Sequence, residues 1–216
     1  MNNNQCSVVV LISGNGSNPQ ALMNFSSAGN YRVCGVISNK ADAYGLQRAK
    51  QSNIPTTVVD HRQFASRDLF DQTLAEAIDK YEPALIVLAG FMRILGADFV
   101  KRYQGKILNI HPSLLPDYPG TNTHQRVLDA GEKSHGVSVH FVTEELDGGP
   151  VIAQESISIQ SCDDAESLAI KTHEKEHLLY PIVASWFADG RLRLDGNDAF
   201  LDEQLLAATG EQIDTS

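Results

Sequence analysis

The sequence Ser7-Val-Val-Val-Leu-Ile-Ser13 leads directly into the turn Gly14-Asn15-Gly16-Ser17-Asn18. A nearly continuous run of β-branched and other apolar residues is typical of a strand buried on both faces of a sheet. Residues 19–28 then predict a helix. A strand, a glycine turn and a helix in this order predict the first unit of an α/β fold.

Strands and helices continue to alternate along the chain. Strands are predicted at 31–38, 56–59, 84–88, 107–109, 137–142 and 151–159, and helices at 44–51, 66–81, 123–130 and about 164–188. Such alternation implies right-handed βαβ units in a mostly parallel sheet. The last two strands are joined by a short loop, which predicts an antiparallel pair at the sheet edge. The predicted fold class is therefore α/β, a mostly parallel sheet flanked by helices, with antiparallel edge strands.

Length and charge limit the classes of protein that fit. A chain of 216 residues with 42% hydrophobic residues is long enough for one globular domain, which we assign to residues 1–194. Residues 195–216 predict a polar, loosely docked C-terminal tail. The 17 Lys and Arg against 27 Asp and Glu give a net charge of −10. Because nucleic acids and anionic membranes are bound largely through Lys and Arg, we expect neither as a partner.

The cysteines and the N-terminal residues suggest a cytoplasmic protein. Cys6, Cys34 and Cys162 lie far apart without a CxxC pair, which argues against a disulfide framework and a thiol metal site. The first residues carry no basic segment, and the apolar run at 8–12 is too short for a signal sequence or a membrane span.

The glycine turn is a candidate anion site. Backbone N–H groups at a helix N-terminus, reached by a glycine turn after a buried strand, commonly bind phosphate. We expect Ser17 or Asn18 as the N-cap and Pro19 at the first helical position. A dinucleotide-binding fingerprint would need glycine where Pro19 stands, which disfavours a Rossmann dinucleotide site. The alternative is an ordinary tight turn with capping residues.

Asn109 and His111 form the second candidate site, in the segment Asn109-Ile-His-Pro-Ser-Leu-Leu-Pro116. Two residues apart in a strand, they project to the same side, at the carboxyl end where open α/β sheets bind ligands. An amide that donates to a developing oxyanion, beside an imidazole that transfers a proton, suits acyl transfer. The alternative is a histidine satisfied within a polar turn. The sequence contains no GxSxG motif, so the attacking group is expected to come from the substrate.

Asp147 is the third candidate, in the segment Thr143-Glu-Glu-Leu-Asp-Gly-Gly-Pro150 between two late strands. A carboxylate in a tight Gly-Gly-Pro turn has a fixed backbone. It can act as a base or favour the protonated form of a neighbouring histidine. The alternative is ordinary turn chemistry, since Asp-Gly is common in hairpins.

The segment His173-Glu-Lys-Glu-His177 matches the HExxH pattern of zinc proteases on a predicted helix. A third ligand would have to come from Asp195, Asp198 or Glu203, none of which lies in a second helical motif. The apolar residues of 178–187 indicate ordinary core packing of this helix. We therefore expect no metal.

Taken together, four segments resemble the phosphoribosylglycinamide formyltransferase family: residues 9–18, 88–95 (Leu-Ala-Gly-Phe-Met-Arg-Ile-Leu), 109–116 and 140–150. The resemblance runs from about residue 7 to 194 in the family's order and spacing. It implies a Rossmann-like formyltransferase fold. It also implies transfer of a formyl group from 10-formyltetrahydrofolate, as cosubstrate, to the amine of 5′-phosphoribosylglycinamide in purine synthesis. The amine would attack directly, with no covalent enzyme intermediate.

The resemblance also implies which residues form the site. Asn109, His111 and Asp147 match the family's catalytic residues. Gly16, Ser17 and Asn18 correspond to its phosphate-binding turn. The substrate-binding helix would contribute Glu176, together with His173, Glu174 and Lys175. The folate pocket would be lined by Arg67, Met92, Arg93, Ile94, Leu95, Asn109, Thr143, Glu144, Glu145, Leu146 and Asp147.

Other functions remain as alternatives. A hydrolase of 10-formyltetrahydrofolate would use water as the acceptor, and related formyltransferases act on methionyl-tRNA or a nucleotide sugar. The tRNA enzyme should carry a C-terminal nucleic-acid-binding domain, but only about 30 residues follow Trp186, without a basic cluster. A non-catalytic nucleotide-binding module has no use for Asn109, His111 and Asp147 together. We expect small-molecule substrates and a monomer or homodimer.

Overall fold

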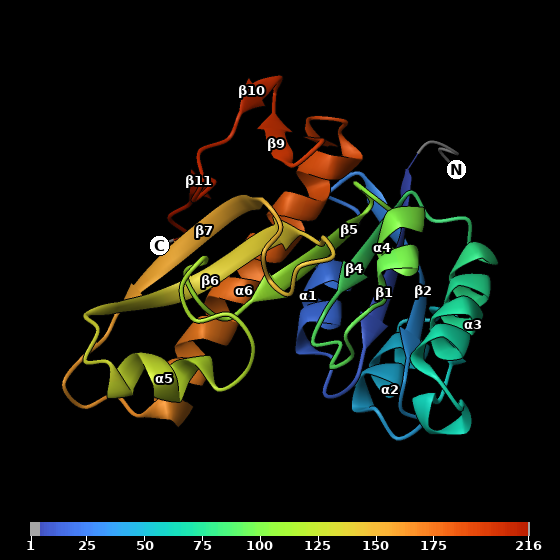
Figure 1. The fold of residues 1–216 in the computed structure, drawn as a ribbon, viewed down its shortest axis with the longest axis horizontal. Coiled ribbons are helices and arrows are strands. Elements are labelled where there is room, and N and C mark those ends of the chain that lie inside the picture. Colours follow the sequence, from blue (N-terminus) through green and yellow to red (C-terminus); the bar gives the residue numbers. More distant parts are fainter. Residues whose placement is uncertain (1–4, 216) are drawn as a thin grey trace.

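The computed structural model describes residues 5–215, within which one main sheet has eight strands in the order β11-β7-β6-β5-β4-β1-β2-β3 (Figure 1). The strands are β1 (Cys6–Ile12), β2 (Tyr31–Ser38), β3 (Thr56–Val58), β4 (Leu85–Leu88), β5 (Ile107–His111), β6 (Ser134–Phe141), β7 (Val151–Ser158) and β11 (Glu211–Gln212). Strands β1 to β5 pair in parallel, and β6 is antiparallel to both of its neighbours. The predicted mostly parallel sheet with antiparallel strands toward one edge is confirmed.

Helices cover both faces of this sheet. They are α1 (Ser17–Phe25), α2 (Tyr44–Gln51), α3 (Arg67–Asp79), α4 (Ala97–Arg102), α5 (Thr123–Asp129) and α6 (Ala165–Ala188), with a short 3₁₀ helix η1 (His61–Gln63). Alternate residues of β1 point to opposite faces, as a strand buried on both sides requires. Val8 and Val10 pack in a cluster with residues of α1, α2 and α6, whereas Val9 packs with residues of α3 and α4.

The glycine turn differs in detail from the prediction. The N-cap of α1 is Gly16, not Ser17 or Asn18, and its backbone is left-handed (φ 77°). A Cβ atom at Gly16 would lie 2.4 Å from the Cα of Gly45, so the close approach of α2 also requires glycine here. Pro19 is consequently the third helical residue, where a backbone N–H would still have no partner within the helix. The helix ends at Phe25 rather than at residue 28.

Residues 195–215 are not loosely docked as predicted. A second, three-stranded sheet contains β8 (Leu192–Asp195), β9 (Asp198–Leu201) and β10 (Gln204–Leu205). Beyond it, β11 adds to the main sheet by pairing in parallel with β7. Short strands with many polar residues gave no periodic signal, and long-range pairing decides their structure. The boundary at residue 194 stays a prediction.

Two further features bear on the site. Helix α4 was not predicted from the sequence, and β5 extends to His111 instead of ending at Asn109.

Across residues 5–215, no helix combines the length and the apolar character needed to cross a membrane.

Candidate active site

The predicted catalytic residues meet at the carboxyl end of the parallel strands. Asn109 and His111 lie on β5, and Asp147 lies in the loop between β6 and β7. Because β6 is antiparallel to β5, with Phe141 opposite Leu108, this loop begins beside the start of β5. It folds back along β5 and so brings Asp147 to Asn109 and His111. Asp147 has a left-handed backbone (φ 51°), a conformation that Asp tolerates better than most residues.

The three side chains are within contact distance. His111 Nδ1 lies 3.5 Å from Asp147 Oδ2, and Asn109 Nδ2 lies 3.5 Å from Asp147 Oδ1. The backbone N–H of Gly120 donates to Asp147 Oδ2 at 2.8 Å, which fixes the carboxylate. The His111 and Asp147 side chains are only 5% and 10% exposed, so their interaction is weakly screened by water.

Hydrogen bonding indicates where the His111 ring carries hydrogens. Its Nε2 lies 2.9 Å from the carbonyl oxygen of Tyr118. Because a carbonyl only accepts, Nε2 carries a hydrogen. Only the protonated ring then also presents an N–H, at Nδ1, to the Asp147 carboxylate. Asp147 is therefore placed to hold a charged His111, which can donate a proton.

His140 is a site residue that the sequence reasoning missed. It lies directly opposite Asn109 in the pairing of β5 with β6, and its Nε2 is 3.0 Å from Asn109 Nδ2. Burial lowers the pKa of His140 to about 4. The antiparallel pairing of these two strands was not predicted, and without it no signal places His140 beside Asn109.

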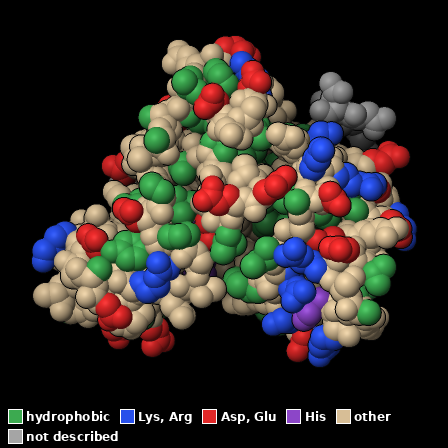
Figure 2. All heavy atoms as spheres, in the orientation of Figure 1, with side chains coloured by type: hydrophobic (Ala, Val, Ile, Leu, Met, Phe, Trp, Pro, Cys, Tyr) green, Lys and Arg blue, Asp and Glu red, His purple; other side chains and the backbone are tan. Residues whose placement is uncertain are grey.

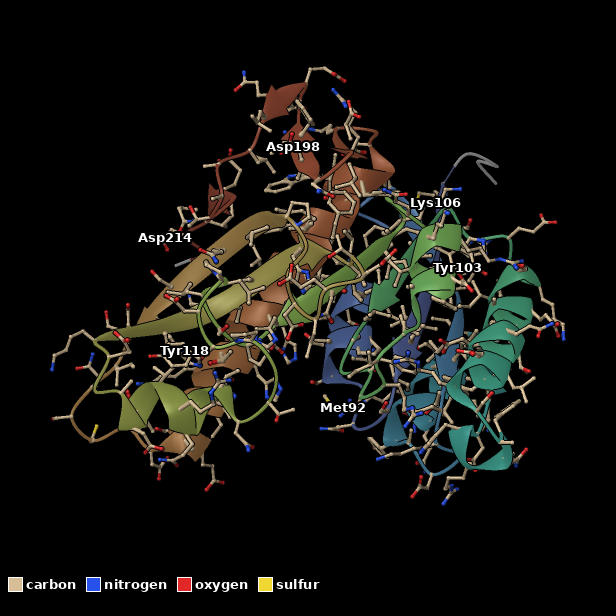
Figure 3. All side chains as sticks on the ribbon, viewed as in Figure 1. Met92, Tyr103, Lys106, Tyr118, Asp198 and Asp214 are labelled. Carbon is tan, nitrogen blue, oxygen red and sulfur yellow. The ribbon has the colours of Figure 1, made fainter. Side chains whose placement is uncertain are left out.

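Most of the predicted folate residues line one cavity beside the catalytic residues. Its lining includes Arg93, Ile94, Leu95, Asn109, Thr143, Glu144, Glu145, Leu146, Asp147 and His140. Figure 2 shows this side of the molecule hollowed at its lower edge, below acidic side chains near the centre of the face. Met92 and Tyr118 lie on the two sides of that notch (Figure 3).

Two predicted folate residues lie outside this cavity lining. Met92 is 68% exposed on the loop after β4. Arg67, at the start of α3, lines a separate cavity between α3 and α4. Its guanidinium stands near Gly96, next to the loop that carries Arg93 to Leu95.

The glycine turn faces α6. Asn18 Nδ2 donates to Glu176 Oε2 at 2.8 Å, and His173 Nε2 lies 3.7 Å from the same oxygen. Burial raises the pKa of Glu176, while the hydrogen bond from Asn18 and the nearby His173 oppose that shift. The predicted phosphate turn and the predicted substrate helix are thus joined through Asn18 and Glu176.

The other residues of the HExxH segment point in several directions. Lys175 Nζ is paired with buried Glu155 of β7 at 2.6 Å, away from Glu176. Glu174 is exposed, and the rings of His173 and His177 stack with their centroids 6.1 Å apart. Among residues 5–215, no three His, Cys, Asp or Glu side chains are grouped so that they could hold a metal ion.

Comparison with known proteins decides the family. A model of the formyl transferase family matches residues 6–184. The chain belongs to the formyl transferase family. It is 50% identical over 209 residues to phosphoribosylglycinamide formyltransferase of Escherichia coli (strain K12), which covers 96% of this chain and 99% of that protein. The enzyme of the same name from Haemophilus influenzae is 46% identical over 205 residues, covering 94% of this chain and 97% of that protein.

A solved structure shares the fold of this formyltransferase. The phosphoribosylglycinamide formyltransferase of Coxiella burnetii matches with a TM-score of 0.94 and 53% identity, covering 97% of this chain and all of that one. The family resemblance read from the sequence and the assignment as an enzyme are therefore confirmed. The roles of individual residues in this formyltransferase stay predictions.

Proposed function

We propose that the chain transfers the formyl group of 10-formyltetrahydrofolate to the amine of 5′-phosphoribosylglycinamide, a step of purine synthesis. The observation that carries the proposal is the meeting of Asn109, His111 and Asp147 beside a cavity at the carboxyl end of β5. The names of the two bacterial relatives support this substrate.

A region of the structure is available for the formyl donor and for the phosphate and glycinamide groups of the acceptor. The formyl donor would occupy the cavity lined by Arg93, Thr143 and Asp147. The phosphate of the acceptor would bind at the N-terminus of α1, where backbone N–H groups are free of helical partners. Glu176, held by Asn18, faces this region and would contact the glycinamide.

The proposed chemistry is direct attack. The amine nitrogen forms a bond to the formyl carbon, and the carbonyl electrons move to its oxygen. Asn109 and protonated His111 stabilise that oxyanion. The tetrahedral intermediate collapses by breaking the bond to the folate nitrogen, which takes the proton that the amine loses, relayed through water beside Asp147. In the structure, the carbonyl oxygen of Tyr118 accepts a hydrogen bond from His111 Nε2. To donate from Nε2 to the oxyanion, His111 must first break this hydrogen bond.

No enzyme nucleophile enters this scheme. Ser113 is the hydroxyl nearest in sequence to the catalytic residues of β5, and its Oγ donates to the Asp117 carbonyl oxygen at 2.6 Å. This hydrogen bond holds the Ser113 hydroxyl within the turn after β5.

One assay tests the proposal. Purified protein is given 10-formyltetrahydrofolate with and without phosphoribosylglycinamide, and release of tetrahydrofolate is followed. We expect release only with the amine. Release that ignores the amine would identify a hydrolase instead. With labelled formyl donor, protein-bound label after rapid acid quench would contradict direct attack.

A further inference from the structure

His140 is in direct contact with Asn109 and is 2% exposed on β6. Its two ring nitrogens each have a defined neighbour. Nδ1 lies 2.8 Å from the carbonyl oxygen of Phe141, and Nε2 lies 3.0 Å from Asn109 Nδ2. The predicted catalytic scheme gives this residue no role.

The hydrogen-bond partners of the His140 ring show which of its nitrogens carries a hydrogen. The Phe141 carbonyl only accepts, so His140 Nδ1 must carry a hydrogen. The neutral ring then has a lone pair at Nε2, which accepts an N–H of the Asn109 amide. A second proton, at Nε2, would set the His140 N–H directly against an N–H of the Asn109 amide. Burial opposes that proton and outweighs the Asp147 carboxylate, whose Oδ1 lies 3.8 Å from Nε2, so that the pKa of His140 is lowered to about 4.

This tautomer decides which way the Asn109 amide faces. If the amide were rotated by half a turn, its carbonyl oxygen would meet the lone pair of His140 Nε2 and repel it. The NH₂ group therefore stays between His140 and Asp147. Asp147 Oδ1 is 3.5 Å from Asn109 Nδ2, a long contact that leaves the second N–H available to a stronger acceptor.

We propose that His140 is a positioning residue whose Nδ1–H tautomer keeps the NH₂ group of Asn109, rather than its carbonyl, facing the reacting formyl oxygen. This inference rests on the proposed function, because it concerns an oxyanion that forms during formyl transfer. His140 acts through Asn109 and does not itself touch the reacting atoms. Without it, only the long contact with Asp147 Oδ1 would favour the donating orientation of Asn109, and the amide would also populate the orientation that cannot donate to the oxyanion.

The first test compares two replacements. His140→Leu keeps an apolar side chain without an acceptor, whereas His140→Gln can place an oxygen near the position of Nε2. We expect His140→Leu to lower kcat by about tenfold or more with little change in either KM, because the orientation of an oxyanion donor matters in the transition state. His140→Gln should recover most of that loss. Thermal unfolding of each variant checks that it is folded.

The second test asks whether His140 works through Asn109. Asn109→Ala alone should cost about 10²–10³ in kcat, as removal of an oxyanion donor does. Adding His140→Leu to Asn109→Ala should then cost nothing further, because the residue that it positions is gone. An equal loss in both backgrounds would overturn the proposal, since a merely structural role affects both alike.

A third readout does not depend on turnover. Long-range ¹H–¹⁵N NMR of the full-length wild-type protein reports the tautomer of each histidine, with His140→Gln identifying the His140 signals. We expect a neutral ring protonated at Nδ1, and a ring protonated at Nε2 would refute the inference even if His140→Leu fails to fold. If the protein transfers no formyl group to the amine while NMR shows the Nδ1–H tautomer, the proposed function fails and the orientation of Asn109 stands.

Discussion

Replacing Lys175 by methionine should destabilise the protein without impairing formyl transfer. Lys175 Nζ lies 2.6 Å from Glu155 Oε1, and the Glu155 side chain is 2% exposed. The same oxygen accepts from the backbone N–H and the hydroxyl of Thr215, at 3.1 and 2.7 Å. Glu155 Oε2 has no hydrogen-bond partner among the described residues. Without the ammonium group, a buried carboxylate would depend on Thr215 alone.

The expected loss is large because the remaining charge cannot reach water. Removing one partner of a buried ion pair typically costs about 3–5 kcal/mol, whereas replacing both partners by uncharged groups costs much less. We therefore expect Lys175→Met to lower the free energy of unfolding by about 3–5 kcal/mol. The double variant Glu155→Gln with Lys175→Met should recover most of it.

Urea unfolding, followed by circular dichroism and by the fluorescence of the single tryptophan Trp186, measures these values. Lys50→Met, at an exposed position of α2, is the matched control and should change stability by less than about 0.5 kcal/mol. If Lys175→Met is as stable as wild type but raises the KM for phosphoribosylglycinamide, the structural reasoning is wrong. Lys175 would then bind substrate, as the family resemblance implies.

Three further outcomes are expected. Asp147→Asn should lower turnover at least about tenfold with little change in formyl-donor affinity, measured by steady-state kinetics and donor titration; near-normal turnover would remove Asp147 from the mechanism. Ser13→Ala should raise the KM for the formyl donor and not for the amine. Ser13 Oγ accepts the Met92 N–H at 2.8 Å and donates to Asn39, and so holds the loop whose residues Arg93 to Leu95 line the donor cavity. Ser13→Thr should restore it, and equal changes in both KM values would count against this. Burial lowers the pKa of His135 from 6.5 to about 4, so the unfolded chain takes up the proton first. The Tm should therefore fall between about pH 6.5 and pH 4, and fall less in His135→Gln; parallel curves would exclude His135 as a cause.

Short-range patterns in the sequence were enough for the α/β class. The apolar run of β1 and the alternation of strands and helices reflect burial on both sheet faces, which depends on local periodicity. The start of α6 was also readable, because Asp164 caps it through the N–H of Ser167. The spacing of Asn109 and His111 on one strand likewise needed no tertiary information.

Elements that depend on distant contacts were missed or misplaced. The N-cap of α1 moves to Gly16 because Gly45 of α2 packs against it. Strand β11 exists because β7 offers a free edge, and its two residues carry no periodic signal of their own.

The fold class and the types of residue that acyl transfer needs can both be predicted from the sequence, because both are expressed in local spacing. Which side chains contact one another depends on how the strands and helices pack, and local spacing does not contain that information. The pairing of β5 with β6 sets His140 against Asn109, and the loop after β6 brings Asp147 to His111. The same packing directs Glu176 to Asn18 and its neighbour Lys175 to Glu155. Adjacent helical residues point about 100° apart, so only the packing of α6 shows which of them faces the site.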